Sequence, residues 1–181
     1  MTGRIFYVMG PSGAGKDSLL DYVRERLGRQ ARVLFAHRYI TRPPGGNENH
    51  ISLSEAEFAA RLRAGLFAFS WASHGFHYGI GIEIDLWTNA GFDVVVNGSR
   101  EAYATLPQGR EVLGVLITAS TSTLRKRLLA RGRESVEMIE ARLARSHALE
   151  VPTHAFAIAN DGPLDEGGDA LLDVLTSAPR A

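Results

Sequence analysis

The chain has 181 residues, 45% of them hydrophobic and 22% charged, which suits one globular domain with a full core and excludes a disordered or fibrous protein. Its 20 basic side chains balance 20 acidic ones, so no net positive field favours nucleic acid or an anionic membrane as a partner. The absence of cysteine excludes disulfides, thiolate metal sites and thiol nucleophiles. No apolar run approaches the roughly 20 residues that span a bilayer, and no signal-peptide pattern is visible, so we expect a soluble, cytoplasmic protein.

The elements expected along the chain alternate between strands and helices. Residues 5–9 form a continuous apolar run, typical of a strand buried on both faces, and a glycine-rich turn at 10–15 leads into an expected helix at 18–27. The next residues predict, in order, a strand at 33–40, a loop at 41–49, a helix at 54–64, short strands within 66–79 and a helix at 82–89. The remainder predicts strands at 92–97, 112–118 and 155–160, and helices at 122–131, 136–146 and 165–176.

This alternation indicates an α/β fold built on a mainly parallel sheet. No internal repeat and no linker divides the chain, so we expect a single domain over residues 1–181. Residues from about 42 to 80 break the alternation. We expect them to form a subdomain inserted over the carboxyl edge of the sheet.

The glycine-rich turn carries the strongest motif. Residues 10–17 (GPSGAGKD) nearly match the phosphate-binding loop G-x-x-x-x-G-K-S/T, and they stand between a strand and a helix as that loop requires. Backbone N–H groups and the helix N-terminus would surround phosphate oxygens, while Lys16 would place a mobile charge on the β and γ phosphates of ATP. Asp17 departs from the motif, because a hydroxyl that binds Mg²⁺ is usual there; we treat this carboxylate as a candidate Mg²⁺ ligand. The expected ATP-binding residues of the loop are Gly10, Pro11, Ser12, Gly13, Ala14, Gly15, Lys16, Asp17 and Ser18.

Further stretches extend this motif into a family pattern. With GPSGAGKDS, the segments 41–44 (TRPP), 74–79 (HGFHYG) and 124–133 (LRKRLLARGR) resemble the guanylate kinase-like branch of the nucleoside monophosphate kinases. The resemblance implies a three-layer P-loop NTPase fold with an acceptor-binding insertion and a helical lid at about 125–142. Within the branch, the stretches HRYITRP, ENHISLSEAEF, YGIGIEIDLW and GFDVVVNGSR are most similar to the ribose 1,5-bisphosphate phosphokinases of phosphonate breakdown. That similarity implies phosphoryl transfer from ATP, with Mg²⁺, to ribose 1,5-bisphosphate, which yields 5-phosphoribosyl 1-diphosphate.

Three positions depart from the guanylate kinases in the acceptor site. Phe69 stands where those enzymes have a guanine-reading glutamate, Gly45 where they have a second phosphate-binding arginine, and Asn97 near an aspartate at the end of the central strand. A phenyl ring cannot accept a hydrogen bond from a purine N–H. We therefore expect an acceptor other than a nucleoside monophosphate. A GMP kinase and a non-catalytic guanylate kinase-like binding module are the alternatives, and the intact glycines and Lys16 disfavour the second.

The expected reaction needs positioning and charge neutralisation rather than a general base, because an acceptor phosphate is already ionised at pH 7. Arg42 and the Tyr78 hydroxyl are the candidates for binding an acceptor phosphate. The resemblance implies that Arg127, Arg131 and Arg133 close over the transferring group from the lid, with Arg142 reaching in from the next helix. A solvated surface charge is the alternative for each arginine.

Other polar residues have two interpretations each. Glu48 and His50 either hydrogen-bond ribose hydroxyls or belong to a plain surface loop. Asn160 either lines the adenine pocket or ends a strand in a simple turn. Asn97 is a further candidate for an acceptor contact. We expect small-molecule substrates and no nucleic acid or membrane partner; the oligomeric state stays open, with a homodimer among the options.

Overall fold

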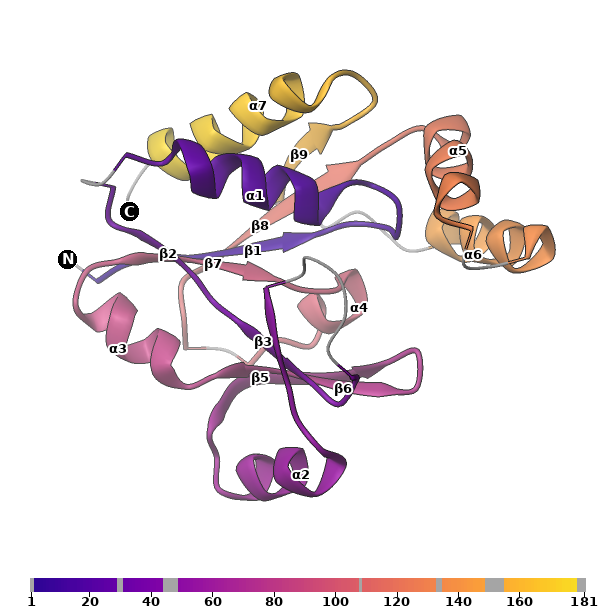
Figure 1. Cartoon of the computed structure of the whole chain (residues 1–181). Coiled ribbons are helices and arrows are strands. Elements are labelled where there is room, and N and C mark those ends of the chain that lie inside the picture. Colours follow the sequence, from indigo (N-terminus) through magenta and orange to yellow (C-terminus); the bar gives the residue numbers. More distant parts are fainter. Residues whose placement is uncertain are drawn as a thin grey trace.

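The computed structural model describes residues 2–28, 31–43, 49–107, 109–132, 135–148 and 155–178, and these ranges hold two sheets (Figure 1). The larger sheet is parallel throughout and has the order β2-β7-β1-β8-β9. Its strands are β1 (Ile5–Met9), β2 (Val33–Phe35), β7 (Asp93–Asn97), β8 (Val112–Thr118) and β9 (Phe156–Ala159). The glycine-rich loop therefore starts at the carboxyl end of the central strand, where α/β folds place their ligands.

Both faces of the larger sheet are buried. On one face, Phe6 and Val8 of β1 pack with α1 (Lys16–Arg26) and α7 (Leu164–Ser177). The alternate residues Ile5 and Tyr7 face the other way, toward α3 (Glu83–Asn89) and the smaller sheet. This double burial explains why β1 is a continuous apolar run rather than an alternating one.

The smaller sheet has the order β4-β3-β6-β5 and carries the segment expected as an insertion. Its strands are β3 (Arg38–Ile40), β4 (His50–Ser52), β5 (Phe67–Ser73) and β6 (Phe76–Gly81), with α2 (Glu55–Arg63) beside them (Figure 1). Strands β5 and β6 form a hairpin whose turn residues His74 and Gly75 have φ values of 52° and 77°. Three short helices complete the described fold: α4 (Arg100–Tyr103), α5 (Thr121–Arg131) and α6 (Val136–Ala148).

The α/β fold and most of the expected elements are confirmed, but the strand expected at 33–40 is wrong. It is two strands in two sheets: β2 pairs with β7, whereas β3 pairs with β4 and β6. The chain crosses between the sheets at residues 36–37, and the apolar pattern continues across the crossing. Strand β4 and helix α4 were not expected, because three and four residues are too few for a periodic signal.

A buried ion pair joins three elements at the amino end of the sheet. Arg4, directly before β1, places Nη2 2.7 Å from Oδ2 of Asp93 at the start of β7, and both side chains are less than 5% exposed. The Arg4 Nη1 also donates to the Ala178 carbonyl oxygen at 2.6 Å, just after α7. Among the described residues no helix is both long enough and apolar enough to cross a membrane.

Candidate active site

The loop between β1 and α1 has a backbone that only glycine adopts easily. Gly13 and Gly15 have φ values of 87° and 89°, in the left-handed region. A Cβ atom at Gly15 would lie 2.5 Å from Nδ2 of Asn160, so no side chain fits there. Helix α1 begins at Lys16, immediately after this turn, and its free N–H groups face the loop. The geometry suits an anion held by the backbone.

Lys16 supplies the positive charge of this loop. Its Nζ donates to the carbonyl oxygen of Gly10 at 2.9 Å. Desolvation lowers the pKa of Lys16 to about 8; Asp17 opposes this shift, and the positive charges of Arg38 and Arg100 add to it. The ammonium group is therefore poorly solvated and only partly compensated by Asp17, and the phosphates of ATP would stabilise its charge.

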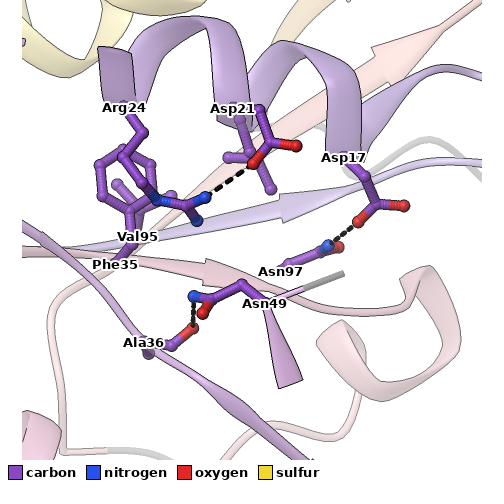
Figure 2. A pocket seen from close by; sticks show the side chains of 9 residues that line it. Asp17, Asp21, Arg24, Phe35, Ala36, Asn49, Val95 and Asn97 are labelled. Atoms are coloured by element: carbon purple, nitrogen blue, oxygen red, sulfur yellow. Dashed lines mark hydrogen bonds and ion pairs between the residues drawn. The ribbon is translucent and has the colours of Figure 1, made fainter. Parts of the chain in front are cut away.

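Asp17 lies beside Asn97, the last residue of β7 (Figure 2). Its Oδ1 accepts a hydrogen bond from Nδ2 of Asn97 at 2.7 Å, and Nη2 of Arg38 is 3.6 Å from the same oxygen. Asp17 and Asn97 line a small pocket of about 20 Å³ that also includes Asp21 and Asn49.

This corner fits a hard cation such as Mg²⁺. Oδ1 of Asn97 is buried and has no hydrogen-bond partner within the described ranges, and Nδ2 of the same amide bonds the Asp17 carboxylate. Carboxylate and amide oxygens are the donors that Mg²⁺ takes, and it takes few of them because phosphate and water complete its shell. The described part of the chain has no cluster of three His, Asp, Glu or Cys side chains that could hold a metal by themselves.

A cleft of about 480 Å³ opens beside the phosphate-binding loop, and both sheets contribute to its walls. The loop supplies Gly10 and Lys16, and the β5–β6 hairpin supplies Trp71 and Tyr78, whose rings stack with centroids 5.3 Å apart. Four cationic side chains line the cleft, against one carboxylate, that of Glu101. These cations are Lys16, Arg38, Arg100 and Arg142. A site of this charge and size suits phosphorylated ligands.

The structure brings together part of the residue set that the sequence singled out. Lys16, Tyr78 and Arg142 line the cleft, as expected of groups that touch the substrates. Arg38 and Arg100 line it as well and were not singled out. Both lie in stretches that carry the family resemblance, but a sequence gives no sign of which face of a short strand or helix turns toward a ligand.

Other expected site residues lie around the cleft rather than in it. Nη1 of Arg127 is 3.4 Å from the carbonyl oxygens of Gly13 and Ala14, so this side chain contacts the loop itself. Arg131 is exposed at the end of α5, and its charge contributes to the lowered pKa of Lys16. Arg42 is half-buried just after β3 and is absent from the cleft lining.

Asn160 supports the loop from behind. It is 3% exposed, and its Nδ2 donates to the carbonyl oxygen of Ala14 at 2.7 Å. Ser18 is exposed on the first turn of α1, and His50 begins β4. Glu48 and Arg133 fall outside the described residues, so their roles stay predictions.

Phe69 does not face the cleft. It is 2% exposed and packs edge-to-face against Tyr7 in the core, with ring centroids 6.2 Å apart. A side chain there makes no contact with an acceptor in this arrangement. Phe69 therefore gives no direct evidence about which acceptor the cleft takes.

The fold and this site define a P-loop kinase of the guanylate kinase type. The crystal structure of guanylate kinase from Anaplasma phagocytophilum is similar in fold, with a TM-score of 0.69 at 16% identity over 96% of this chain and 85% of that chain. No protein-family model matches the chain.

Relatives with higher sequence identity show which family within this class the chain belongs to. The ribose 1,5-bisphosphate phosphokinase PhnN of Desulfomicrobium baculatum is 54% identical over 176 residues, which are 95% of this chain and 94% of that protein. The protein of the same name from Burkholderia pseudomallei is 50% identical and covers 98% of both chains. That from Laribacter hongkongensis is 55% identical over 97% of this chain, which spans only 43% of the longer relative. The chain belongs to the ribose 1,5-bisphosphate phosphokinase PhnN family, and the resemblance seen in the sequence is confirmed.

Proposed function

We propose that this protein transfers the γ-phosphoryl group of ATP to the 1-phosphate of ribose 1,5-bisphosphate. An oxygen of the 1-phosphate attacks the γ-phosphorus, the bond from that phosphorus to the β–γ bridging oxygen breaks, and ADP leaves. The product is 5-phosphoribosyl 1-diphosphate. The observation that carries the proposal is the cleft, in which a phosphate-binding loop and four cationic side chains face one space of about 480 Å³. The names of the relatives supply the acceptor.

The residues of the loop would hold ATP. Backbone N–H groups around Gly13 and Gly15 would bind the phosphate oxygens, and Lys16 would neutralise the β and γ phosphates. Asp17 and Asn97 would hold Mg²⁺, which supplies further positive charge to the phosphates when it is bound. Asn160 would act by keeping the loop in shape, since its amide bonds the Ala14 carbonyl oxygen.

The acceptor would lie against the smaller sheet, with its reacting phosphate held near Lys16. Tyr78, Arg42 and Glu48 are proposed to bind it, and Asn97 is proposed to shape the end of its site. The lid arginines are proposed to neutralise the transferring group; they are Arg127, Arg131, Arg133 and Arg142. Both substrates are charged metabolites that do not cross membranes, so the reaction, and the phosphonate breakdown that it would serve, belong in the cytoplasm.

A coupled assay of ADP release tests this function. The acceptors are ribose 1,5-bisphosphate, ribose 5-phosphate, GMP and AMP, each with ATP and Mg²⁺. We expect turnover well above background with the bisphosphate alone. Comparable turnover with GMP would establish a nucleoside monophosphate kinase instead. A folded protein that binds ATP and turns over none of the four would favour the non-catalytic binding module.

A further inference from the structure

We propose that Arg38 and Arg100 form a subsite for the second phosphate of the acceptor, the 5-phosphate that does not react. The inference rests on the proposed function and adds to it the residues that would distinguish a bisphosphate from a monophosphate. Neither arginine belongs to the phosphate-binding loop or to the lid.

The two arginines come from different sheets and meet at one cleft. Arg38 is the first residue of β3, where it pairs with His50 of β4 and Ile80 of β6. Arg100 is the first residue of α4, which follows β7 of the larger sheet. Both line the cleft that Lys16 and Arg142 also line. A ligand held by both arginines would therefore bridge the two sheets.

The cations of the cleft come from different elements: Lys16 begins α1, Arg38 begins β3, Arg100 begins α4 and Arg142 lies in α6. In Figure 1 the phosphate-binding loop lies between α6, which carries Arg142, and the region of β3 and α4, which carries Arg38 and Arg100. The side near α6 suits the transferring phosphoryl group, because the lid helices lie there. The side near β3 and α4 would then receive the other phosphate of the acceptor.

The chemistry of the acceptor calls for a second anion site. A monophosphate presents one anionic group, which has to lie next to the γ-phosphate. Ribose 1,5-bisphosphate presents another at the far end of its sugar, and enclosing that charge without a cation is costly. Guanidinium groups bind phosphate through a planar fork of two N–H donors, and Arg38 and Arg100 offer two such forks.

Arg38 is held in place by its neighbours. Its side chain is 13% exposed, and its Nη2 lies 3.6 Å from Oδ1 of Asp17, which Asn97 fixes with a hydrogen bond of 2.7 Å. Arg100 is partly buried, and desolvation lowers the pKa of its guanidinium below the usual value. Both charges act on Lys16 and lower its pKa. Three cations this close favour binding of a polyanion.

The test uses ribose 5-phosphate, which carries the second phosphate and lacks the reacting one. Its dissociation constant is measured by isothermal titration calorimetry for the parent protein and for Arg38→Gln and Arg100→Gln, which remove the charge and keep a planar amide. Arg38→Lys and Arg100→Lys keep the charge and lose the fork. Arg63→Gln, on the exposed side of α2 and away from the cleft, is the matched control.

Losing a charge-assisted hydrogen bond should raise the dissociation constant about 10- to 150-fold in each glutamine variant. The lysine variants should show a smaller rise and the control none. We expect kcat/KM for ribose 1,5-bisphosphate to fall by a similar factor, and the affinity for ATP to change less than that, because the two arginines act on the ATP site only through their charge on Lys16.

Several outcomes would overturn the subsite. One is a parent protein that does not bind ribose 5-phosphate. Another is an unchanged dissociation constant in variants that fold, as judged by their melting temperature; if turnover of the bisphosphate still falls, the arginines act on the reacting phosphate instead. Should a glutamine variant fail to fold, its lysine counterpart decides by the same measurement. Failure of the proposed function is separate, because it appears as a parent protein that turns over GMP in place of the bisphosphate.

Discussion

Lys16 combines a structural hydrogen bond with a charge in poorly solvated surroundings. Its pKa is lowered from 10.5 to about 8, with desolvation as the main cause. Below pH 8 the folded protein has to keep this ammonium charged in an unfavourable place, which costs stability. Between about pH 8 and 10.5 the unfolded chain still binds the proton and the folded one does not. The free energy of unfolding therefore increases as the pH rises through this range.

ATP binding should therefore depend on pH through Lys16. Above pH 8 the Lys16 amine is mostly neutral and has to take up a proton when ATP binds. The dissociation constant of ATP should therefore rise, approaching about tenfold for each further pH unit. Calorimetry at pH 8.5 in two buffers of different ionisation enthalpy should detect proton uptake. Lys16→Met should bind ATP weakly and lose this pH dependence, whereas a parent protein whose ATP affinity is constant from pH 7 to 9.5 would contradict the lowered pKa.

Asp17 has two candidate roles. A carboxylate about 4 Å from a phosphate charge is repelled by roughly 4 kcal/mol at an effective dielectric constant of 20, whereas the helix dipole returns only about 0.3–1 kcal/mol. A cation bound between the carboxylate and the phosphate would turn this repulsion into attraction. The second role is to position Arg38, from which Asp17 is 3.6 Å away.

Two variants at Asp17 separate these roles. If the carboxylate helps to hold Mg²⁺, Asp17→Ala should raise the Mg²⁺ concentration needed both for half-maximal activity and for tight ADP binding measured by calorimetry. Asp17→Thr, which has the hydroxyl usual at this position, should bring both Mg²⁺ concentrations part of the way back to the parent values. If the Mg²⁺ dependence keeps its parent value and only the affinity for ribose 5-phosphate weakens, the residue serves Arg38 alone.

At the scale of elements, the Arg4–Asp93 pair joins β1, β7 and the end of α7. Removing one partner of a buried pair leaves the other charge without compensation. Asp93→Ala should therefore lower the free energy of unfolding by about 3–5 kcal/mol, measured by urea denaturation, and the double variant Arg4→Met/Asp93→Leu should recover much of it.

The pair Arg24–Asp21 on α1 is the matched control for this prediction. It has the same chemistry, with N and O 2.6 Å apart, but its side chains are 39% and 44% exposed. Asp21→Ala should cost less than about 1 kcal/mol, because water screens the pair. Equal losses at the two sites would show that burial does not govern the Arg4–Asp93 contribution.

Elements with a strong period were predictable, and short ones were not. The buried runs of β1 and β7 and the passage from the glycine-rich loop into a helix follow from local sequence, since each has a direct physical cause, although the helix begins at Lys16 rather than at the expected residue 18. The division of 33–40 between two sheets does not, because β2 and β3 are three residues each and the partners that separate them lie far along the chain. For the same reason the sequence did not identify Arg38 as a site residue, because its place in the cleft depends on which sheet its strand joins.

The whole molecule is neutral, yet its positive charge is concentrated. Basic and acidic residues number 20 each, whereas the cleft has four cations and one carboxylate. The association of a polyanionic acceptor should therefore be steered by the local field and weakened by salt.

Raising the ionic strength from 0.05 to about 0.5 M should raise the KM for ribose 1,5-bisphosphate roughly tenfold, at the low end of measured steering effects. Steady-state kinetics at several KCl concentrations gives the slope of KM against ionic strength, and Arg100→Gln should reduce that slope. A melting temperature followed over the same range controls for a change in stability. A KM that does not respond to salt would mean that the cleft's charges are compensated within the protein.

The central place of β1 also governs how the chain comes together as it is made. Ile5 pairs with Val94 on one side and Val112 on the other, so neither neighbour exists when β1 leaves the ribosome. At 5–20 residues per second, about 5–20 s pass before β8 is complete. During that interval β1 cannot yet pair with both β7 and β8, and strand pairing over such sequence distances is slow. Newly made chains should therefore need protection from aggregation until β7 and β8 have been synthesised.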